Sequence, residues 1–284
     1  MLLRKIRSQK SARYRILRER LTEPLHLNLA ALTVGLCGSL RTKIDFDLVQ
    51  RPHYAYGLLA AADQAADQGL KAFTAVEFGV AAGEGLLNLC SIAKRVEQAT
   101  GIAVSVVGFD SGCGMPPPVD YRDHPEEFQF GDFPMDHDRL CAQLPANCQL
   151  VLGPVRQTVR TFLKNAISDA PLGFAAFDLD YYTSTREALA LLADSDPSKY
   201  LFLPILYFDD IVLPNYNEWA GELLAIREFN RCHELRKIEA YRFLRSRRIM
   251  KNARWIDQIF LLHLFDHPWL KRTREIRTMP NVYF

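Results

Sequence analysis

The chain has 284 residues, a formal net charge of +2 and a hydrophobic content of 49%. These values are typical of a globular protein with one large α/β domain and a small appendage, and the charge gives no reason to expect a nucleic acid partner. The six cysteines are scattered without a Cys-x-x-Cys pair, which argues against a zinc site and favours the reducing cytoplasm. No apolar run is long enough to span a membrane, and the first residues do not have the pattern of a signal peptide.

Residues 1–22 differ from the rest of the chain in their charge. They contain eight basic residues and one acidic residue, Glu19, with apolar side chains near helical spacing. The pattern predicts a basic helix, either solvated or in weak contact with an anionic membrane surface or an acidic partner. Residues 23–50 have the composition of a mixed connector. We therefore expect a basic helical extension over residues 1–50 and the main domain over residues 51–284.

A glycine-rich turn lies near the start of the main domain. The patterns predict a helix over residues 54–69, a buried strand over 73–78 and another helix over 84–98. The turn between this strand and the following helix contains Gly79, Gly83 and Gly85. A strand, a glycine turn and a helix in this order form the ligand crevice of an open α/β sheet.

The spacing of these glycines indicates the kind of ligand. We expect the carboxylate of Glu77 in the crevice, and Gly79 and Gly83 let the backbone pass close to a ligand. The spacing Glu-x-Gly-x-x-x-Gly-x-Gly differs from the Gly-x-Gly-x-x-Gly of dinucleotide sites. It suits a nucleoside ligand without a pyrophosphate, such as S-adenosylmethionine. The alternative is a purely structural turn.

An acidic residue ends the second predicted strand. Residues 103–110 are almost entirely apolar and end in Asp110. A carboxylate at this place usually holds a ribose diol, because it can accept hydrogen bonds from two hydroxyls; a helix cap is the alternative. Residues 111–135 form a long loop rich in Gly, Pro and aromatic residues. A loop of this length in a compact domain is usually a functional cover.

The remaining patterns complete a doubly wound sheet. We predict strands over residues 149–152, 172–179 and 201–208, a helix over 217–230, and an antiparallel pair of 237–244 with 258–265. The fold class is therefore α/β, a Rossmann-like sheet that is mostly parallel with a C-terminal antiparallel hairpin. Two successive strands are followed by carboxylates that we expect in one crevice: Asp178, Asp180, Asp209 and Asp210.

These four carboxylates need a counter-charge, because unpaired carboxylates in a cleft lose hydration or take up protons. No Lys or Arg lies within two residues of either pair. Oxygen ligands without His or Cys favour Mg²⁺, with Ca²⁺ or Mn²⁺ as alternatives; helix capping is the simpler interpretation. A divalent cation would lower the pKa of a substrate hydroxyl, and a carboxylate that is not a ligand would take its proton.

Residues 73–230 resemble class I S-adenosylmethionine-dependent methyltransferases, and among them the macrocin O-methyltransferase family of metal-dependent sugar O-methyltransferases. The segments that carry the resemblance are Val-Glu-Phe-Gly-Val-Ala-Ala-Gly-Glu-Gly at 76–85, Phe-Asp-Ser-Gly-Cys-Gly-Met-Pro at 109–116, Asp-x-Asp-x-Tyr-x-Ser-Thr at 178–185 and Phe-Asp-Asp at 208–210. The chain departs from the family at Leu179, where glycine is usual, and at Ile211, where tyrosine is common.

The resemblance implies roles for individual residues. It implies that Mg²⁺ is bound by Asp178, Asp209 and Asp210, and that Asp180 is the general base. It also implies that S-adenosylmethionine is held by Glu77, Gly79, Gly83, Gly85, Asp110 and Ser111.

We therefore predict an Mg²⁺-dependent O-methyltransferase that acts on a hydroxyl of a small glycosylated or polyol-like molecule. One alternative is an NAD-type Rossmann oxidoreductase, which the glycine spacing and the lack of a Tyr-x-x-x-Lys arrangement weaken. Another is a non-catalytic binding module of the same fold that acts through the basic amino-terminal segment. The sequence leaves the acceptor undefined, and an oligomer is possible.

Overall fold

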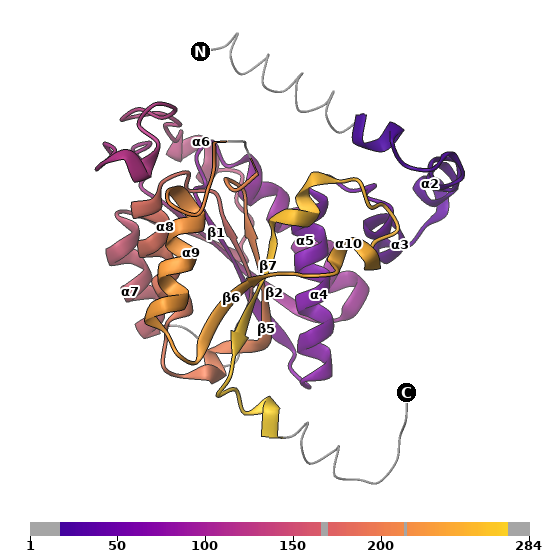
Figure 1. The fold of residues 1–284 in the computed structure, drawn as a ribbon. Helices are drawn as coiled ribbons and strands as arrows, with labels where there is room; N and C mark the ends of the chain where they lie inside the picture. Colours follow the sequence, from indigo (N-terminus) through magenta and orange to yellow (C-terminus); the bar gives the residue numbers. More distant parts are fainter. Residues whose placement is uncertain (1–17, 166–169, 213–214, 272–284) are drawn as a thin grey trace.

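The computed structural model describes residues 18–165, 170–212 and 215–271. Its centre is a seven-stranded sheet with the order β3-β2-β1-β4-β5-β7-β6 (Figure 1). The strands are β1 (Ala72–Phe78), β2 (Ala103–Asp110), β3 (Cys148–Leu152), β4 (Leu172–Phe177), β5 (Tyr200–Phe208), β6 (Arg236–Ala240) and β7 (Ile259–Leu264). The pairs among β1 to β5 are parallel, whereas β7 is antiparallel to both β5 and β6. This confirms the predicted α/β sheet and its C-terminal hairpin.

Helices cover both faces of the sheet (Figure 1). The longer helices are α2 (Leu25–Cys37), α4 (Pro52–Asp67), α5 (Glu84–Thr100), α7 (Val155–Asn165) and α9 (Gly221–Cys232); the shorter ones are α3 (Leu40–Asp45), α6 (His137–Cys141), α8 (Tyr182–Ala188) and α10 (Leu244–Arg247). Helices α4 and α5 contribute Leu58 and Leu89 to one buried cluster. Helices α7 and α9 contribute Val159 and Leu224 to the cluster on the other face. The sheet is therefore buried on both sides, as its apolar strands require.

A row of stacked phenylalanines sets the level at which the central strands end. Phe78 stacks on Phe109 at 4.9 Å and on Phe177 at 5.2 Å, and Phe177 stacks on Phe208 at 4.7 Å. These four residues are register partners across β2, β1, β4 and β5. Each phenylalanine is followed by a residue that leaves the sheet at the same edge. These residues are Gly79, Asp110, Asp178 and Asp209.

Several element boundaries differ from the predicted ones. Residues 23–50 are not a connector but contain α2 and α3. The strand expected over 237–244 ends at Ala240, because the chain turns there and Leu244 begins α10. The helix expected over 217–230 begins at Gly221.

The carboxyl-terminal part of the chain packs against α3. The guanidinium of Arg248 donates to the carbonyl oxygen of Ile44 at 2.6 Å and to a carboxylate oxygen of Asp47 at 2.7 Å. Ile44 and Val49 also belong to the buried cluster around α4. Part of the segment before residue 51 is thus built into the main core, and the predicted division at residue 50 stays a prediction. Residues 1–17, most of the predicted basic helix, lie outside the described residues.

Candidate active site

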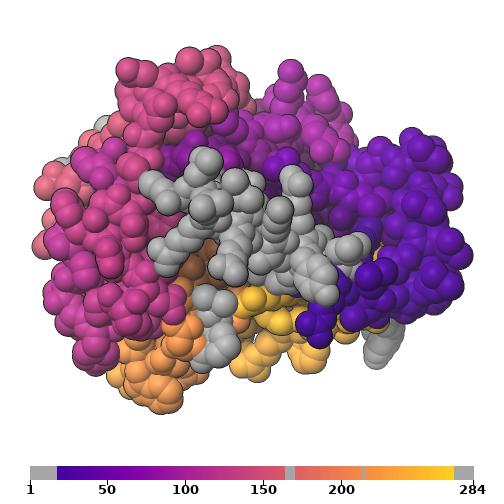
Figure 2. Space-filling model, turned by 90° about the horizontal axis from the view of Figure 1, so that it is seen from above, coloured from indigo at the N-terminus to yellow at the C-terminus, as the bar shows by residue number. Residues whose placement is uncertain are grey.

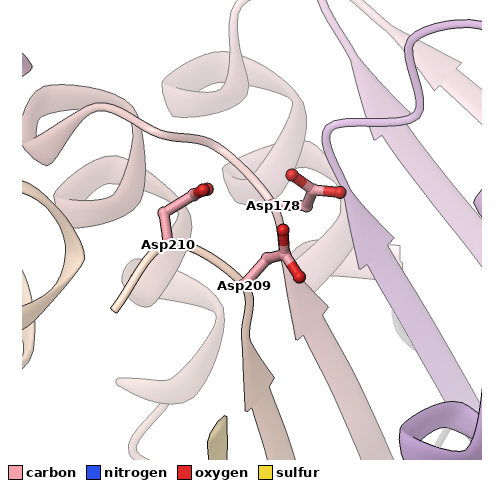
Figure 3. Close-up of side chains that lie close together, drawn as sticks. All are labelled: Asp178, Asp209 and Asp210. Atoms are coloured by element: carbon pink, nitrogen blue, oxygen red, sulfur yellow. The ribbon is translucent and has the colours of Figure 1, made fainter. Parts of the chain in front are cut away.

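Three aspartates meet where β4 and β5 end. Asp178 follows β4, and Asp209 and Asp210 follow β5, so the pairing of these strands brings the side chains together (Figure 3). Each carboxylate offers one oxygen atom, and these oxygens lie within 4.8 Å of one another. The predicted metal ligands are therefore neighbours in space, in the arrangement that a hard cation with oxygen ligands requires.

The surroundings of these carboxylates disfavour their charge. Burial raises the pKa of Asp178 well above its usual value, and repulsion from Asp209 and Asp210 raises it further. Burial also raises the pKa of Asp210, together with the charges of Asp180 and Asp209. A cation held between the carboxylates would relieve this repulsion, so the donor atoms fit a hard divalent ion such as Mg²⁺.

Asp180 and Glu222 form a second layer of carboxylates beside the three aspartates. The backbone N–H of Asp180, at φ 57°, donates to Asp210 at 3.1 Å. Glu222 is fully buried in the first turn of α9 and accepts from the backbone N–H of Asp210 at 3.1 Å. Burial raises the pKa of both Asp180 and Glu222. The sequence analysis missed Glu222, which lies 12 residues beyond Asp210.

Arg51 brings positive charge to the site from a distant part of the chain. It precedes α4 in a left-handed conformation with φ 49°, and its guanidinium lies 5.3 Å from the centre of the Tyr54 ring. Burial lowers the pKa of Arg51, but attraction to Tyr54, Glu77 and Asp178 outweighs it and raises the pKa. Nothing in the local sequence identified this arginine, because only the fold brings it to the carboxylates.

The glycine turn passes close to the aspartates. Gly79 has φ 84°, and a Cβ at this position would lie 1.8 Å from the carbonyl oxygen of Asp178. Gly83 also has φ 84°, and a Cβ there would lie 2.3 Å from Leu140. Gly79 therefore requires glycine for conformation and for space, because it meets backbone, whereas at Gly83 the left-handed conformation is the stronger reason. The turn predicted from the sequence is present, and it connects β1 to α5 beside Asp178.

Glu77 lies beneath the turn rather than in the crevice, where we had expected its carboxylate. It is 1% exposed and accepts a hydrogen bond from the Tyr54 hydroxyl at 2.7 Å. A Cβ on Gly85 would lie 2.0 Å from its Oε1 atom, so Gly85 lets the first turn of α5 settle on this carboxylate. Burial raises the pKa of Glu77 to about 7, against the opposing effects of Tyr54 and Arg51. Its contact with a cofactor stays a prediction.

Asp110 organises the loops on both sides of it. Its Oδ2 accepts from the N–H of Ala81 at 2.9 Å, and its Oδ1 accepts from the N–H of Gly112 at 2.7 Å. Each carboxylate oxygen has a second lone pair, so the group can still accept from ribose hydroxyls. The Ser111 hydroxyl donates to the carbonyl oxygen of Gly114 at 2.7 Å and shapes the start of the long loop.

A cavity of about 680 Å³ extends from the glycine turn to the aspartates. Its lining includes Gly79, Asp110 and Ser111, and also Asp180 together with the three aspartates described above. Residues 113–117 of the long loop line it as well, together with Phe130 and Phe133. The loop thus covers the crevice as predicted. Glu77, Gly83 and Gly85 are not among the residues that line this cavity.

The long loop is fastened by a buried carboxylate. Asp123 is fully buried and accepts from the backbone N–H of Thr183 at 2.9 Å and from its hydroxyl at 3.0 Å. It also accepts from the N–H of Val119 within the loop at 2.9 Å. Thr183 is in the first turn of α8, so a loop residue caps this helix from a distance of 60 residues in the sequence. The cap ties the cover of the cavity to the helix that follows Asp180.

A second cavity of about 590 Å³ also reaches the aspartate pair. Asp209 and Asp210 line both cavities. The remaining wall of the second cavity includes Arg51, His53 and Trp255, together with residues 19, 20 and 23 of the amino-terminal segment. The Tyr207 hydroxyl donates to a carboxylate oxygen of Asp209, and the amide of Gln258 donates to its carbonyl oxygen at 2.8 Å. These contacts fix Asp209 between the two cavities.

Comparison with known proteins identifies relatives by structure alone. No protein-family model matches the chain, and no curated protein matches it. The O-methyltransferase NovP has a TM-score of 0.50 at 15% identity, with 75% of this chain and 79% of NovP covered. The calicheamicin methyltransferase CalS11 has a TM-score of 0.47 at 22% identity, with 78% of this chain and 84% of CalS11 covered. The chain has the same Rossmann-like fold as NovP, in agreement with the predicted fold class.

The geometry unites most of the residues that the sequence singled out. The aspartates at 178, 180, 209 and 210 share one cavity with Gly79, Asp110 and Ser111. The neighbours that the sequence did not reveal as site residues are Arg51, Tyr54, Tyr207, Glu222 and Gln258.

Within the described ranges, no helix is both long and apolar enough to cross a membrane.

Proposed function

We propose that this protein is an S-adenosylmethionine-dependent, Mg²⁺-dependent O-methyltransferase that acts on a hydroxyl of a small glycosylated or polyol-like molecule. The observation that carries the proposal is the position of Asp209 and Asp210, which line two adjoining cavities beside Asp178. A methyl transfer needs a donor and an acceptor on opposite sides of the moving carbon. Two cavities separated by one acidic centre offer such an arrangement.

The first cavity suits the methyl donor. Asp110 has lone pairs left for a ribose diol, and Gly79 leaves space for a ligand against the backbone. Phe130 and Phe133 line the same cavity and are available to an adenine ring. The fold shared with NovP, an O-methyltransferase, supports a donor of this class. The methionine end would then point toward Asp178.

The second cavity suits the acceptor. Its polar wall, which includes Arg51, His53 and Asp209, offers hydrogen-bond donors and acceptors to a molecule with several hydroxyls. An acceptor hydroxyl that enters here would meet Asp209 and Asp210, which also line the first cavity. Such placement supplies much of the acceleration in a direct transfer, since no covalent enzyme intermediate is needed.

Asp178, Asp209 and Asp210 would hold the metal ion, and Mg²⁺ bound there would lower the pKa of a coordinated hydroxyl. Asp180 is a carboxylate outside this set that lines the same cavity and donates to Asp210 through its backbone N–H. The side chain of Asp180 would accept the acceptor's proton as general base. Glu222 keeps Asp210 in place by accepting from its N–H.

Calorimetry tests this proposal directly. Titration of the full chain with S-adenosylhomocysteine, with and without Mg²⁺, should give saturable binding of the nucleoside, and titration with Mg²⁺ alone should report the metal. Asp110→Ala should weaken nucleoside binding while Mg²⁺ binding persists, and Asp209→Asn should do the reverse. Binding of NAD in place of S-adenosylhomocysteine would refute the donor assignment. Nucleoside binding that is unaffected by Asp110→Ala would refute the location of the donor.

A further inference from the structure

Helix α2 has two apolar sides, and the fold covers one of them. Leu27, Ala31 and Val34 lie at helical spacing i, i+4 and i+7 and pack with Phe46 and Met250. The α2 helix is thereby attached to the body of the protein along this side. Figure 1 shows it at the periphery, away from the central sheet, and Figure 2 shows the indigo amino-terminal segment as a lobe at the edge of the molecule.

The opposite side of α2 carries a row of exposed leucines. Their exposed fractions are 75% for Leu25, 58% for Leu29, 68% for Leu32 and 89% for Leu36. The spacing of 4, 3 and 4 residues places all four on one face of the helix. We call these four residues the leucine row. Single exposed leucines are common on protein surfaces, whereas a continuous apolar row marks a surface that contacts something else.

The charges around the leucine row indicate what it contacts. Residues 24–40 contain no Lys, Arg, Asp or Glu. Directly before them, residues 1–23 contain eight basic residues and two acidic ones, Glu19 and Glu23. An apolar helix face next to a strongly basic segment is the combination that binds the surface of an anionic bilayer. Arg18, the first basic residue that the structure describes, is exposed and lies three residues before Leu21, which is itself 73% exposed.

We propose that the leucine row and the basic segment dock the protein on the surface of an anionic lipid bilayer. With 13 residues, α2 is about 20 Å long, whereas the hydrocarbon core of a bilayer is about 30 Å thick. The helix is therefore suited to lie in the interface, with its leucines among the acyl chains and the basic residues at the headgroups. Two weak signals acting together are what reversible membrane attachment requires.

A second copy of the chain fits the leucine row less well than a bilayer does. A pairing limited to four leucines from each copy would lie at the low end of the roughly 1,200–2,000 Å² that stable interfaces bury. In a parallel pair it would also place two basic segments next to each other, where their charges repel. A bilayer with acidic headgroups satisfies both the apolar row and the positive charge.

Vesicle co-sedimentation with the full chain tests the proposal. The test vesicles contain phosphatidylcholine with 30% phosphatidylglycerol, which is about one anionic lipid in three. We expect the protein to partition into them at least tenfold more strongly than into vesicles of pure phosphatidylcholine. Replacing Leu29→Ser together with Leu32→Ser should lower that partition at least tenfold. The matched control is Leu235→Ser, an exposed leucine elsewhere on the surface, which should leave it unchanged. Since these leucines are exposed, circular dichroism should show all variants to be folded.

Charge and self-association give independent readouts. Replacing Arg13, Arg15 and Arg18 with Gln should weaken binding to the anionic vesicles, and added salt should do the same. Equal partition of the wild type and the double-serine variant would overturn the proposal. So would a dimer of the wild type, seen by sedimentation velocity, that dissociates in the double-serine variant while neither protein binds vesicles. None of these readouts uses methyl transfer, so the proposal stands or falls separately from the proposed chemistry.

Discussion

The rings of Phe177 and Phe208 stack with centres 4.7 Å apart and planes inclined by 9°, and the next residue of each strand is an aspartate of the site. The two phenylalanines are register partners in β4 and β5. Because this stacked pair is fully buried, it fixes the relative height at which Asp178 and Asp209 leave the sheet. The apolar core thus sets the spacing of the charged residues above it.

Gly79 should not tolerate a side chain. In Gly79→Ala the new Cβ would meet the carbonyl oxygen of Asp178, and the left-handed backbone would be strained as well. We expect loss of nucleoside and Mg²⁺ binding, with a decrease of about 1–3 kcal/mol in the free energy of unfolding. The matched control is Gly69→Ala, which has φ 75° but nothing within 4 Å of the added Cβ. Calorimetry should show normal ligand binding in the control; equal loss in both variants would contradict the steric argument.

Removal of one aspartate charge should make the metal-free protein more stable. In Asp178→Asn the repulsion among the three carboxylates decreases, and each unit by which the pKa of Asp178 is raised corresponds to about 1.4 kcal/mol. We expect a higher melting temperature than the wild type in EDTA, and no further increase when Mg²⁺ is added. Wild-type protein should be stabilised by Mg²⁺. Asp138→Asn, on an exposed surface, serves as control. A lower melting temperature of Asp178→Asn in EDTA would contradict the prediction.

Glu77 should make the ligand-free fold less stable as the pH rises. Its pKa is about 7 in the folded protein and near 4.5 in the unfolded chain, so the folded state binds more protons between these values. The stabilisation is complete below about pH 4.5 and is lost as the pH rises through 7, with a total of roughly 3 kcal/mol.

Glu77→Gln removes this titration while Tyr54 keeps a hydrogen-bond acceptor. The stability of the variant relative to the wild type should therefore increase from pH 5 to pH 8, as measured by urea unfolding at each pH. A constant difference across that range would show that Glu77 does not titrate there.

Asp123 should hold the loop over the first cavity. Asp123→Ala leaves the N–H of Thr183 and that of Val119 without their acceptor, which should cost about 1–3 kcal/mol of stability. The loop should also become more accessible, and we expect faster proteolysis within residues 111–135 together with weaker nucleoside binding. Asp120→Ala removes a neighbouring carboxylate that pairs with Arg122 on the surface, and it should leave the loop protected. Unchanged proteolysis in Asp123→Ala would exclude the anchoring role.

The sequence was informative for those features that follow from the residue pattern of a single strand or helix. The alternation of apolar strands and helices predicted the sheet, and Asp178, Asp209 and Asp210 could be placed together because parallel strands end at one edge. Residues 23–50 were misjudged because α2 leaves Leu25, Leu29, Leu32 and Leu36 exposed and only partly buries Leu27, which hides the usual periodicity of an amphipathic helix.

The partners of the site residues could not be predicted from local patterns. Tyr54 reaches Glu77 across 23 residues, and Arg51 approaches Asp178 only after α4 has packed on the sheet. The position of Glu77 was misjudged for a related reason. A carboxylate at the end of β1 can lie either in the crevice or in the core. The carboxylate of Glu77 lies in the core, because Gly85 packs directly against it.

Among the described residues, the last strand, β7, does not occupy the edge of the sheet but is inserted between β5 and β6. Gln258, immediately before it, donates to the carbonyl oxygen of Asp209. During synthesis, β5 therefore gains its second neighbour, and Asp209 its contact with Gln258, only after residues 258–264 have left the ribosome. A nascent chain stopped before residue 258 would contain every acidic residue of the site yet lack the strand that braces two of them.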